Sequence, residues 1–363
     1  MSPPAIAPPV SHPAPETYPV LEITGLVKRY GGIAVVDGID LSVRQGELLA
    51  ILGPSGCGKT TTLRLVAGFE EPDRGAIAIG GETMSRPGRC EPPERRRVGM
   101  VFQDGVLFPH LSVGDNVGFG VDAAQRRQRV EWALDVVGLS GMGKRMPYQL
   151  SGGQQQRVSL ARAIAPNPRI ILLDEPFASL DAALKTRLRT EMRQVLRDIS
   201  ATAIWVTHDQ EEALSLADRV VVMFDGRVAQ HATPEELYHR PVSRKVGSFV
   251  GDAQFLPGQA HGRIVSCELG ELPTFGAMSG PVDVMIRPES LRLSPTAEAE
   301  PNGSVTDRLF FGHDQLLRVR LDTGATLNAR LGSYGGIRLG DRVHVSVRGA
   351  VLTLERKDGF GGE

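Results

Sequence analysis

The stretch that decides the fold reads Gly53-Pro54-Ser55-Gly56-Cys57-Gly58-Lys59-Thr60. Its spacing is that of a phosphate-binding loop, G-x-x-x-x-G-K-[ST]. An apolar run at 48–52 precedes the loop and predicts a strand, and a helical pattern begins at Thr61. Because a strand, a glycine-rich loop and a helix in this order bind nucleotide phosphates, we interpret residues 53–61 as a nucleotide site.

The residue types of this loop fit the chemistry of a phosphate. Gly53, Gly56 and Gly58 carry no Cβ, so the backbone N–H groups can approach the phosphate closely. Lys59 brings a positive charge toward the β- and γ-phosphates. The hydroxyl of Thr60 is a ligand of the kind that Mg²⁺ prefers. We therefore expect a nucleotide with its magnesium ion at this loop.

The composition is that of an ordinary globular protein and argues against several functional classes. The 363 residues suggest two domains, and the 41 basic and 42 acidic side chains leave no net field to hold a polyanion, so we expect no nucleic acid partner. The three cysteines lack the spacing of a zinc site or a disulfide framework. The sequence contains no run of about 18 apolar residues, the length that a membrane-spanning helix needs. We expect the basic run at 95–97 to form a solvated loop.

The pattern of the chain changes along its length. We expect three parts, which are a disordered proline-rich tail over 1–19, an α/β domain over 20–245 and a small all-β domain over 246–363. In the α/β domain, β-branched runs such as 170–173 and 203–207 alternate with helical stretches, which is typical of a largely parallel sheet. In the last part, apolar and polar residues alternate at 317–321 and 343–347, which predicts antiparallel strands.

The apolar run at 170–173 ends in two carboxylates, Asp174 and Glu175. At the end of a strand beside a phosphate loop, Asp174 is placed to hold a metal ion through water. Glu175 is placed to accept a proton from a water that attacks the γ-phosphate. The alternative is a buried strand followed by two solvated acids, which the phosphate loop disfavours.

A third motif reads Leu150-Ser151-Gly152-Gly153-Gln154-Gln155-Gln156-Arg157-Val158. Ser151 is a good N-cap, and the paired glycines expose backbone donors at the positive end of the helix that follows. Apolar residues at helical spacing, Val158, Ala161 and Ile164, predict that this helix packs against a core. The residues alone fit an anion-binding helix start and a simple capped helix equally well.

The order and spacing of these motifs resemble the ATP-binding-cassette (ABC) ATPases, and specifically the nucleotide-binding subunit of a bacterial importer, from Val20 to the C-terminus. The resemblance implies a P-loop cassette domain with a helical subdomain at about 104–165, followed by an oligonucleotide-binding-fold-like (OB-like) β-domain. It implies ATP and Mg²⁺ as ligands. It also implies a homodimer in which one subunit closes over ATP held by the phosphate loop of the other, through Ser151, Gly152, Gly153 and Gln154.

The resemblance carries roles to four further positions. Tyr30 matches the aromatic residue that stacks on adenine, and Gln103 matches the glutamine that contacts Mg²⁺ and the attacking water. Asp181 matches the loop between the two ATP sites, although its spacing alone equally predicts a helix N-cap. His208 matches the histidine that contacts the γ-phosphate, although a histidine at a strand end is more often structural. The expected catalytic residues are Glu175, His208 and Gln103, and the expected metal ligands are Thr60, Gln103 and Asp174.

An importer subunit of this kind would act at the cytoplasmic face of the cell membrane. Its helical subdomain would dock on integral-membrane permease subunits, which receive cargo from a periplasmic or lipid-anchored solute-binding protein. Closure of two subunits on ATP would then drive the permease, and hydrolysis would reset it.

Similarity alone indicates the type of importer. Residues 285–289 and 311–314 resemble the β-domain appended to importers of sugars, polyamines, sulfate and iron. Residues 103–110 and 249–257 resemble the ferric-iron importers most. We therefore expect ferric iron as the cargo, with polyamines or another small solute as the alternative. A remote alternative is an ABC ATPase without a membrane partner, of the kinds that act in DNA repair, chromosome organisation or translation.

Overall fold

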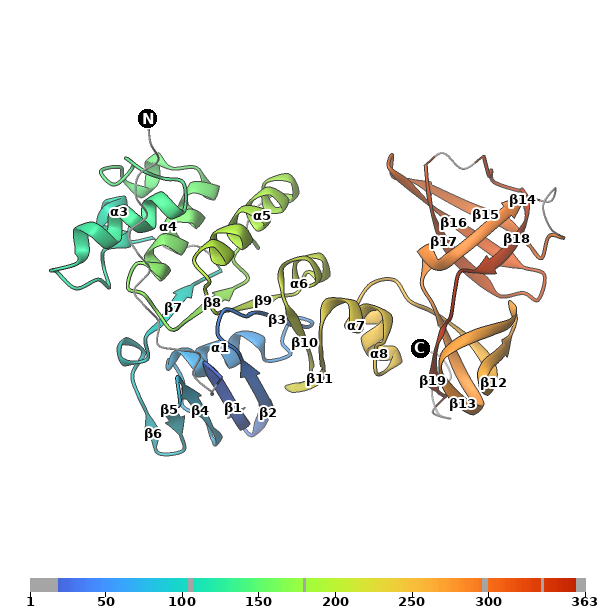
Figure 1. Cartoon of the computed structure of the whole chain (residues 1–363), viewed down its shortest axis with the longest axis horizontal. Coiled ribbons are helices and arrows are strands. Elements are labelled where there is room, and N and C mark those ends of the chain that lie inside the picture. The colour runs from blue at the N-terminus through green and yellow to red at the C-terminus, as the bar shows by residue number, and fades with distance from the viewer. Residues whose placement is uncertain (1–18, 104–106, 179–180, 296–299, 334–335, 357–363) are drawn as a thin grey trace. The chain divides into compact units, whose positions relative to one another are not determined.

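The computed structural model describes residues 19–103, 107–178, 181–295, 300–333 and 336–356. The expected tail lies outside these residues apart from Pro19, as do 104–106 and 179–180. The chain divides into two compact units, Met1–Pro234 and Glu235–Glu363, whose elements are labelled in Figure 1. The boundary expected after residue 245 differs from this division, because the helices α7 (Pro234–His239) and α8 (Arg244–Phe249) group with the C-terminal unit.

A six-stranded sheet forms the centre of the N-terminal unit. Its strands are, in spatial order, β11 (Arg227–Ala232), β10 (Arg219–Phe224), β3 (Leu48–Leu52), β9 (Ala203–Thr207), β8 (Ile170–Asp174) and β7 (Val98–Val101). Strands β10 to β7 are mutually parallel, and β11 is antiparallel. Every residue of β3, β8 and β9 is buried, as expected of strands covered on both faces. The predicted α/β fold with a largely parallel sheet is confirmed.

Helices cover both faces of this sheet, and successive residues of a strand enter two different cores. Leu49 and Ile51 of β3 pack with helix α1 (Lys59–Ala67). Leu48 belongs to the opposite core, which contains the helical region. That region comprises α2 (Val113–Val117), α3 (Arg126–Val136), the 3₁₀ turn η2 (Pro147–Gln149), α4 (Gly152–Ile164), α5 (Ala182–Asp198) and α6 (Gln210–Leu216).

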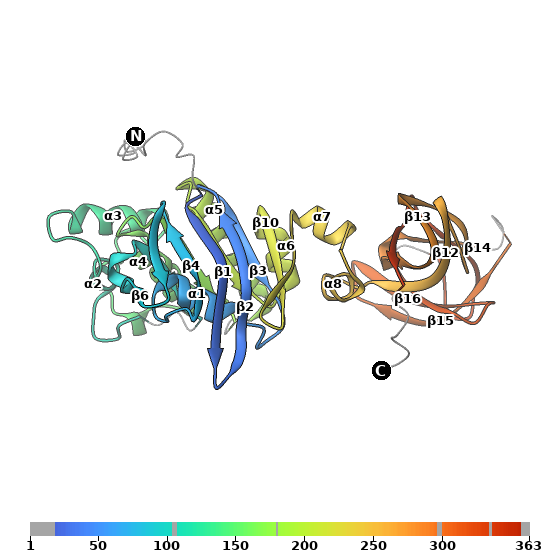
Figure 2. The same cartoon turned by 90° about the horizontal axis from the view of Figure 1, so that it is seen from below.

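A second sheet of the N-terminal unit is antiparallel and was not predicted from the sequence. Its order is β2 (Ile33–Val43), β1 (Leu21–Tyr30), β4 (Arg74–Ile79), β5 (Glu82–Arg86) and β6 (Arg89–Cys90), and Figure 2 shows the long pair β1 and β2. Leu21, Ile23 and Val36 of this sheet share the core of α1. Register shifts after Ile23 and Leu26 interrupt the apolar alternation of β1, so the period-two signal of such a strand is weak.

The expectation that residues 95–97 form a solvated loop is wrong for Arg96. Its side chain has no exposed surface, whereas Arg95 and Arg97 are exposed. The guanidinium of Arg96, which follows the 3₁₀ turn η1 (Pro93–Arg95), donates at 2.9 Å to the carbonyl oxygens of Leu65 and Val66 in the last turn of α1. The Leu65 carbonyl also accepts from the backbone N–H of the C-cap Gly68 at 3.3 Å. Arg96 thus adds side-chain donors to the last carbonyls of the helix that begins at the phosphate loop, and stabilises its end.

The C-terminal unit consists of two antiparallel sheets and the 3₁₀ turn η3 (Pro288–Ser290) around one core. One sheet contains β12 (Gln254–Cys267), β13 (Gly270–Ile286) and β19 (Leu352–Glu355). The other contains, in spatial order, β14 (Leu291–Pro295), β18 (Arg342–Val347), β15 (Gly303–Phe310), β16 (Asp314–Leu321) and β17 (Thr326–Gly332). Alternate residues of β16 and β18 are buried, which confirms the prediction of antiparallel strands there. No described helix is long and apolar enough to cross a membrane.

Candidate active site

The phosphate loop connects β3 to α1, as its sequence predicts. Gly58 caps α1 with φ of 101°, and a Cβ at this position would lie 2.3 Å from the carbonyl oxygen of Val35. A Cβ on Gly53 would lie 2.5 Å from Cys57 Sγ. Gly56 has φ of 81° and no heavy atom within 4 Å of the Cβ position. Two glycines are thus required by packing within the chain, and Gly56 leaves backbone open to solvent.

Lys59, the charged residue of the loop, is tightly held. Its side chain is only 5% exposed. The Nζ atom donates to the carbonyl oxygens of Gly53 at 2.8 Å and Pro54 at 2.9 Å. The ammonium group therefore lies across the loop and is held there by the loop's own backbone.

Two side chains with oxygen atoms that could bind a metal ion meet at the loop. The hydroxyl of Thr60 donates to Asp174 Oδ1 at 3.0 Å, and Asp174 is 6% exposed. Burial raises the pKa of the Asp174 carboxyl, while the hydrogen bond from Thr60 and the charges of Arg64 and Lys59 act in the opposite direction. A hydroxyl and a carboxylate are hard oxygen ligands, so this donor pair fits Mg²⁺.

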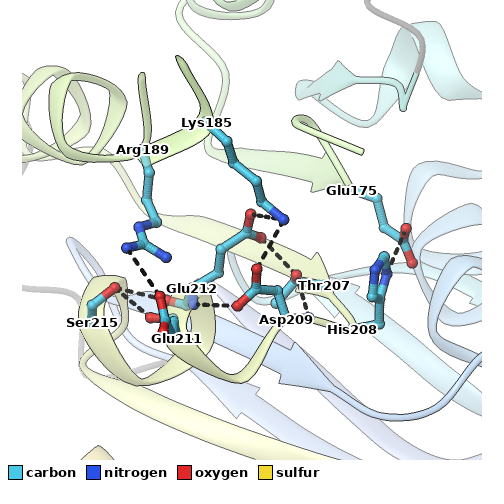
Figure 3. A network of polar contacts seen from close by, with 9 residues as sticks. All are labelled: Glu175, Lys185, Arg189, Thr207, His208, Asp209, Glu211, Glu212 and Ser215. Atoms are coloured by element: carbon cyan, nitrogen blue, oxygen red, sulfur yellow. Dashed lines mark hydrogen bonds and ion pairs between the residues drawn. The ribbon is translucent and has the colours of Figure 1, made fainter. Parts of the chain in front are cut away.

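The structure also brings Glu175 and His208 together, as Figure 3 shows. Glu175 follows β8 and His208 follows the neighbouring parallel strand β9, so both lie at the same edge of the sheet. Glu175 Oε2 lies 2.9 Å from Nδ1 of His208. Glu175 has φ of 42°, in the left-handed region that favours glycine. The Glu175 side chain is 17% exposed and that of His208 is 52% exposed, so the pair is accessible from solvent.

A polar cluster next to His208 was missed by reasoning from the sequence. It links α5 to the start of α6 through Lys185, Thr207, Asp209 and Glu212 (Figure 3). Asp209 is the N-cap of α6 and accepts from the backbone N–H of Glu212 at 3.2 Å. An aspartate followed three residues later by a glutamate is a capping pattern, and this signal could have identified two members of the cluster.

Four groups of predicted site residues belong to elements other than the phosphate loop. Tyr30, at the end of β1, is 45% exposed and its hydroxyl is hydrogen-bonded to Glu70. Gln103 follows β7 and is exposed. Asp181 is the N-cap of α5 and accepts from Leu184 N at 3.0 Å, which confirms the cap that its spacing allows. Across the described residues, no hydrogen bond joins these side chains to Lys59.

The fourth group is the segment 151–154 at the start of α4. Ser151 Oγ accepts from Gln154 N at 3.4 Å, and the Gln154 side chain accepts from Ser151 N at 3.0 Å. This reciprocal capping box confirms Ser151 as the N-cap. Ser151 and Gly152 are exposed, whereas Gly153 is buried. The predicted face through Val158, Ala161 and Ile164 is buried.

Residues 36–178 match the ABC transporter family, and residues 284–354 match the TOBE domain family. An Fe(3+) ions import ATP-binding protein of Rhodococcus jostii (FbpC 2) is 45% identical over 343 residues, which are 92% of this chain and 99% of the relative. The chain belongs to the ABC transporter family. This ABC protein also resembles a spermidine/putrescine import ATP-binding protein of Marinobacter nauticus, with 42% identity over 85% of the chain and 87% of the relative.

Solved structures give the same assignment for the N-terminal unit. The dimeric ATP-binding cassette MJ0796 in a post-hydrolysis state bound to ADP and Pi has a TM-score of 0.52 and 30% identity, covering 59% of this chain and 98% of that one. The cbiO1 protein of Clostridium perfringens, part of an ABC transporter complex, has a TM-score of 0.54 and 29% identity, covering 60% of this chain and 90% of that one. The ABC protein therefore has the cassette fold and is the ATP-hydrolysing subunit of a transporter.

Proposed function

We propose that this subunit energises the import of ferric iron, as a homodimer bound at the cytoplasmic face of the membrane to permease subunits that are served by a solute-binding protein. The assignment of ferric iron as the cargo rests on similarity to a protein named for Fe(3+) import. That similarity covers nearly the whole chain, including the C-terminal unit. A protein of Mesorhizobium japonicum with the same description is 45% identical over 83% of the chain and 87% of its own length.

In this proposal Glu175 is the general base of hydrolysis. Its carboxylate accepts a proton from the attacking water, while His208, 2.9 Å away, holds that carboxylate in place and reaches toward the γ-phosphate. Lys59 neutralises charge on the phosphates from its fixed position across the loop. Positioning and charge stabilisation thus supply the catalysis, without a covalent intermediate on the protein.

The same proposal assigns Mg²⁺ to the oxygen donors of Thr60, Asp174 and Gln103. The contact of Thr60 with Asp174 supports two of these ligands, and exposed Gln103 follows the strand next to β8. When bound, the ion would neutralise negative charge on the β- and γ-phosphates. The role of Thr60 is then to keep the Asp174 carboxylate oriented toward the loop.

A second copy of the chain completes the site in this proposal. Ser151, Gly152 and Asp181 are exposed, and within the described part of the chain no hydrogen bond joins them to Lys59, so a nucleotide held by the partner could reach them. Gly153 and Gln154 form the first turn of α4, directly after Ser151 and Gly152. Exposed Tyr30 offers one ring face to adenine, with the ammonium of Lys28 5.4 Å from its ring centroid.

The cargo is tested by uptake of labelled ferric iron in iron-starved cells that lack the gene and are complemented with wild type or Glu175→Gln. Labelled putrescine is measured in parallel, because the 42% identical Marinobacter relative is named for polyamine import. Iron uptake restored by wild type and not by Glu175→Gln supports the proposal. Restoration of putrescine uptake alone would assign the subunit to a polyamine importer instead.

A further inference from the structure

The cluster of Lys185, Thr207, Asp209 and Glu212 connects two elements that bear proposed site residues. Lys185 lies in the first turns of α5, where its backbone N–H donates to the carbonyl oxygen of Asp181 at 2.9 Å. Its ammonium group reaches Asp209 Oδ2 at 2.8 Å and Glu212 Oε1 at 3.1 Å (Figure 3). One cation thus joins the start of α5 to the start of α6.

One carboxylate of the cluster, that of Glu212, is buried and needs a cation beside it. Glu212 is 2% exposed, and its other carboxylate oxygen accepts from the Thr207 hydroxyl at 2.6 Å. A carboxylate in such surroundings requires an opposite charge and hydrogen bonds. Burial of Lys185 alone would lower its pKa, but the hydrogen bond to Asp209 and the negative charges of Asp209 and Glu212 outweigh burial and raise the pKa, so the ammonium stays charged.

The same contacts fix the backbone on both sides of His208. Thr207, before it, is held by Glu212 and also accepts from the backbone N–H of Asp209 at 3.0 Å. Asp209, after it, is held by Lys185 and caps α6. The hydrogen bond drawn for the His208 side chain in Figure 3 is to Glu175, at 2.9 Å. The position of the imidazole therefore depends on a turn whose two ends are tied to Lys185.

We propose that Lys185 is a positioning residue for ATP hydrolysis, which holds the His208 turn against Glu175 and ties that turn to Asp181 at the start of α5. This inference rests on the proposed roles of Glu175 and His208. Lys185 is one helical turn beyond Asp181 and does not belong to the phosphate loop, so it acts on turnover and not on nucleotide binding. A displacement of about 1 Å at a catalytic group is enough to reduce a rate about 100-fold.

The test compares purified full-length Lys185→Met, Lys185→Arg and Arg189→Met with wild type, by steady-state ATP hydrolysis and thermal unfolding. Arg189 is a matched control because it also pairs α5 with α6, at 3.8 Å to Glu211, but its partner is 85% exposed. We expect Lys185→Met to lower kcat by about 10-fold or more with KM within about twofold. Lys185→Arg, which keeps the charge, and Arg189→Met should stay within about threefold of wild type.

Unchanged kcat in Lys185→Met, or an equal loss in Arg189→Met, would overturn the inference. If Lys185→Met does not fold, Asp209→Asn replaces it, because asparagine keeps the cap and loses the ion pair. This variant should show the same fall in kcat at unchanged KM, and wild-type turnover in it would equally overturn the inference.

A double-mutant cycle separates positioning from general stability. In a His208→Ala background, Lys185→Met should cause no further loss, since it acts through the missing imidazole. A second, multiplicative loss would contradict action through His208. Wild-type turnover in both Glu175→Gln and His208→Ala would contradict the proposed active site itself. If both of these variants are impaired and Lys185→Met is not, only the role of Lys185 is contradicted.

Discussion

The phosphate loop and the segment 151–154 are both glycine-rich and both begin a helix, but the chain holds them differently. In the loop, Lys59 is buried against loop carbonyls and Gly58 packs against the backbone of Val35. In the segment, Ser151 makes only the cap of its own helix and remains exposed. The phosphate loop is therefore held by contacts within the chain, whereas the start of the segment is exposed, as its proposed action on a second copy requires.

The largest effect is expected at the half that is built within the chain. Glu175→Gln should slow hydrolysis by about 10² to 10⁴, because the variant cannot accept a proton from water. ATP binding should persist, since the phosphate loop is untouched. Phosphate release and equilibrium ATP binding measure the two effects. Glu211→Gln, at an exposed position of α6, is the control. Wild-type turnover in Glu175→Gln would remove Glu175 from its role.

The next largest effect is expected at the C-terminal end of α1, the helix that follows the phosphate loop. Arg96→Met should lower the free energy of unfolding by about 2–4 kcal/mol, because the carbonyl oxygens of Leu65 and Val66 lose a buried donor. Urea denaturation measures it. Arg95→Met, at an exposed neighbour, should change stability by less than about 0.5 kcal/mol. Equal effects of the two variants would show that α1 does not depend on this contact.

Lys59→Ala should weaken ATP binding by about 10- to 100-fold, the range expected for loss of a hydrogen-bonding charge aimed at phosphate. Binding is measured with a fluorescent ATP analogue on the purified chain. Arg64→Ala is a suitable control, because Arg64 lies in the same helix but is exposed. Normal affinity in Lys59→Ala would contradict the assignment of the loop.

The smallest effect is expected at the outward-facing segment. Ser151→Ala should cost about 1 kcal/mol of stability, the usual value of an N-cap, and should leave ATP affinity of the loop unchanged. Thermal unfolding and ATP binding of the single variant measure this. A large loss of ATP affinity would place the segment beside the nucleotide of its own chain.

Mixing two variants sharpens the same comparison. If the segment acts on the partner's nucleotide, a heterodimer of Lys59→Ala and Ser151→Ala contains one site with both defects and one site with neither. Each variant alone should then hydrolyse ATP more slowly than wild type, and mixing the two should restore hydrolysis in that intact site. No restoration above the separate variants would contradict action across the dimer.

Sequence reasoning succeeded where the motif and the local structure coincide. The strand before the phosphate loop, the helix after it, the cap at Ser151 and the antiparallel strands near the C-terminus all depend on patterns within a few residues. The pairing of Glu175 with His208 follows from two neighbouring parallel strands, although the chain separates the two residues by 33 positions.

The parts that were missed depend on contacts between distant stretches. Arg96 looks like Arg95 and Arg97 in the sequence, but it is buried where the end of α1, about thirty residues earlier, Ser85 and Glu91 supply oxygen acceptors. Lys185 similarly resembles a solvent-facing helix residue until α6 packs beside it. A basic side chain has the same local pattern in both settings, so only the fold distinguishes them.

The backbone of Glu175 has a consequence for how this protein can evolve. With φ of 42°, the position would suit glycine better than any other residue. A Glu175→Gly chain should therefore fold at least as well as wild type while losing the carboxylate proposed as proton acceptor. Selection for stability alone would then favour glycine at position 175, so we expect selection for transport activity to retain the glutamate.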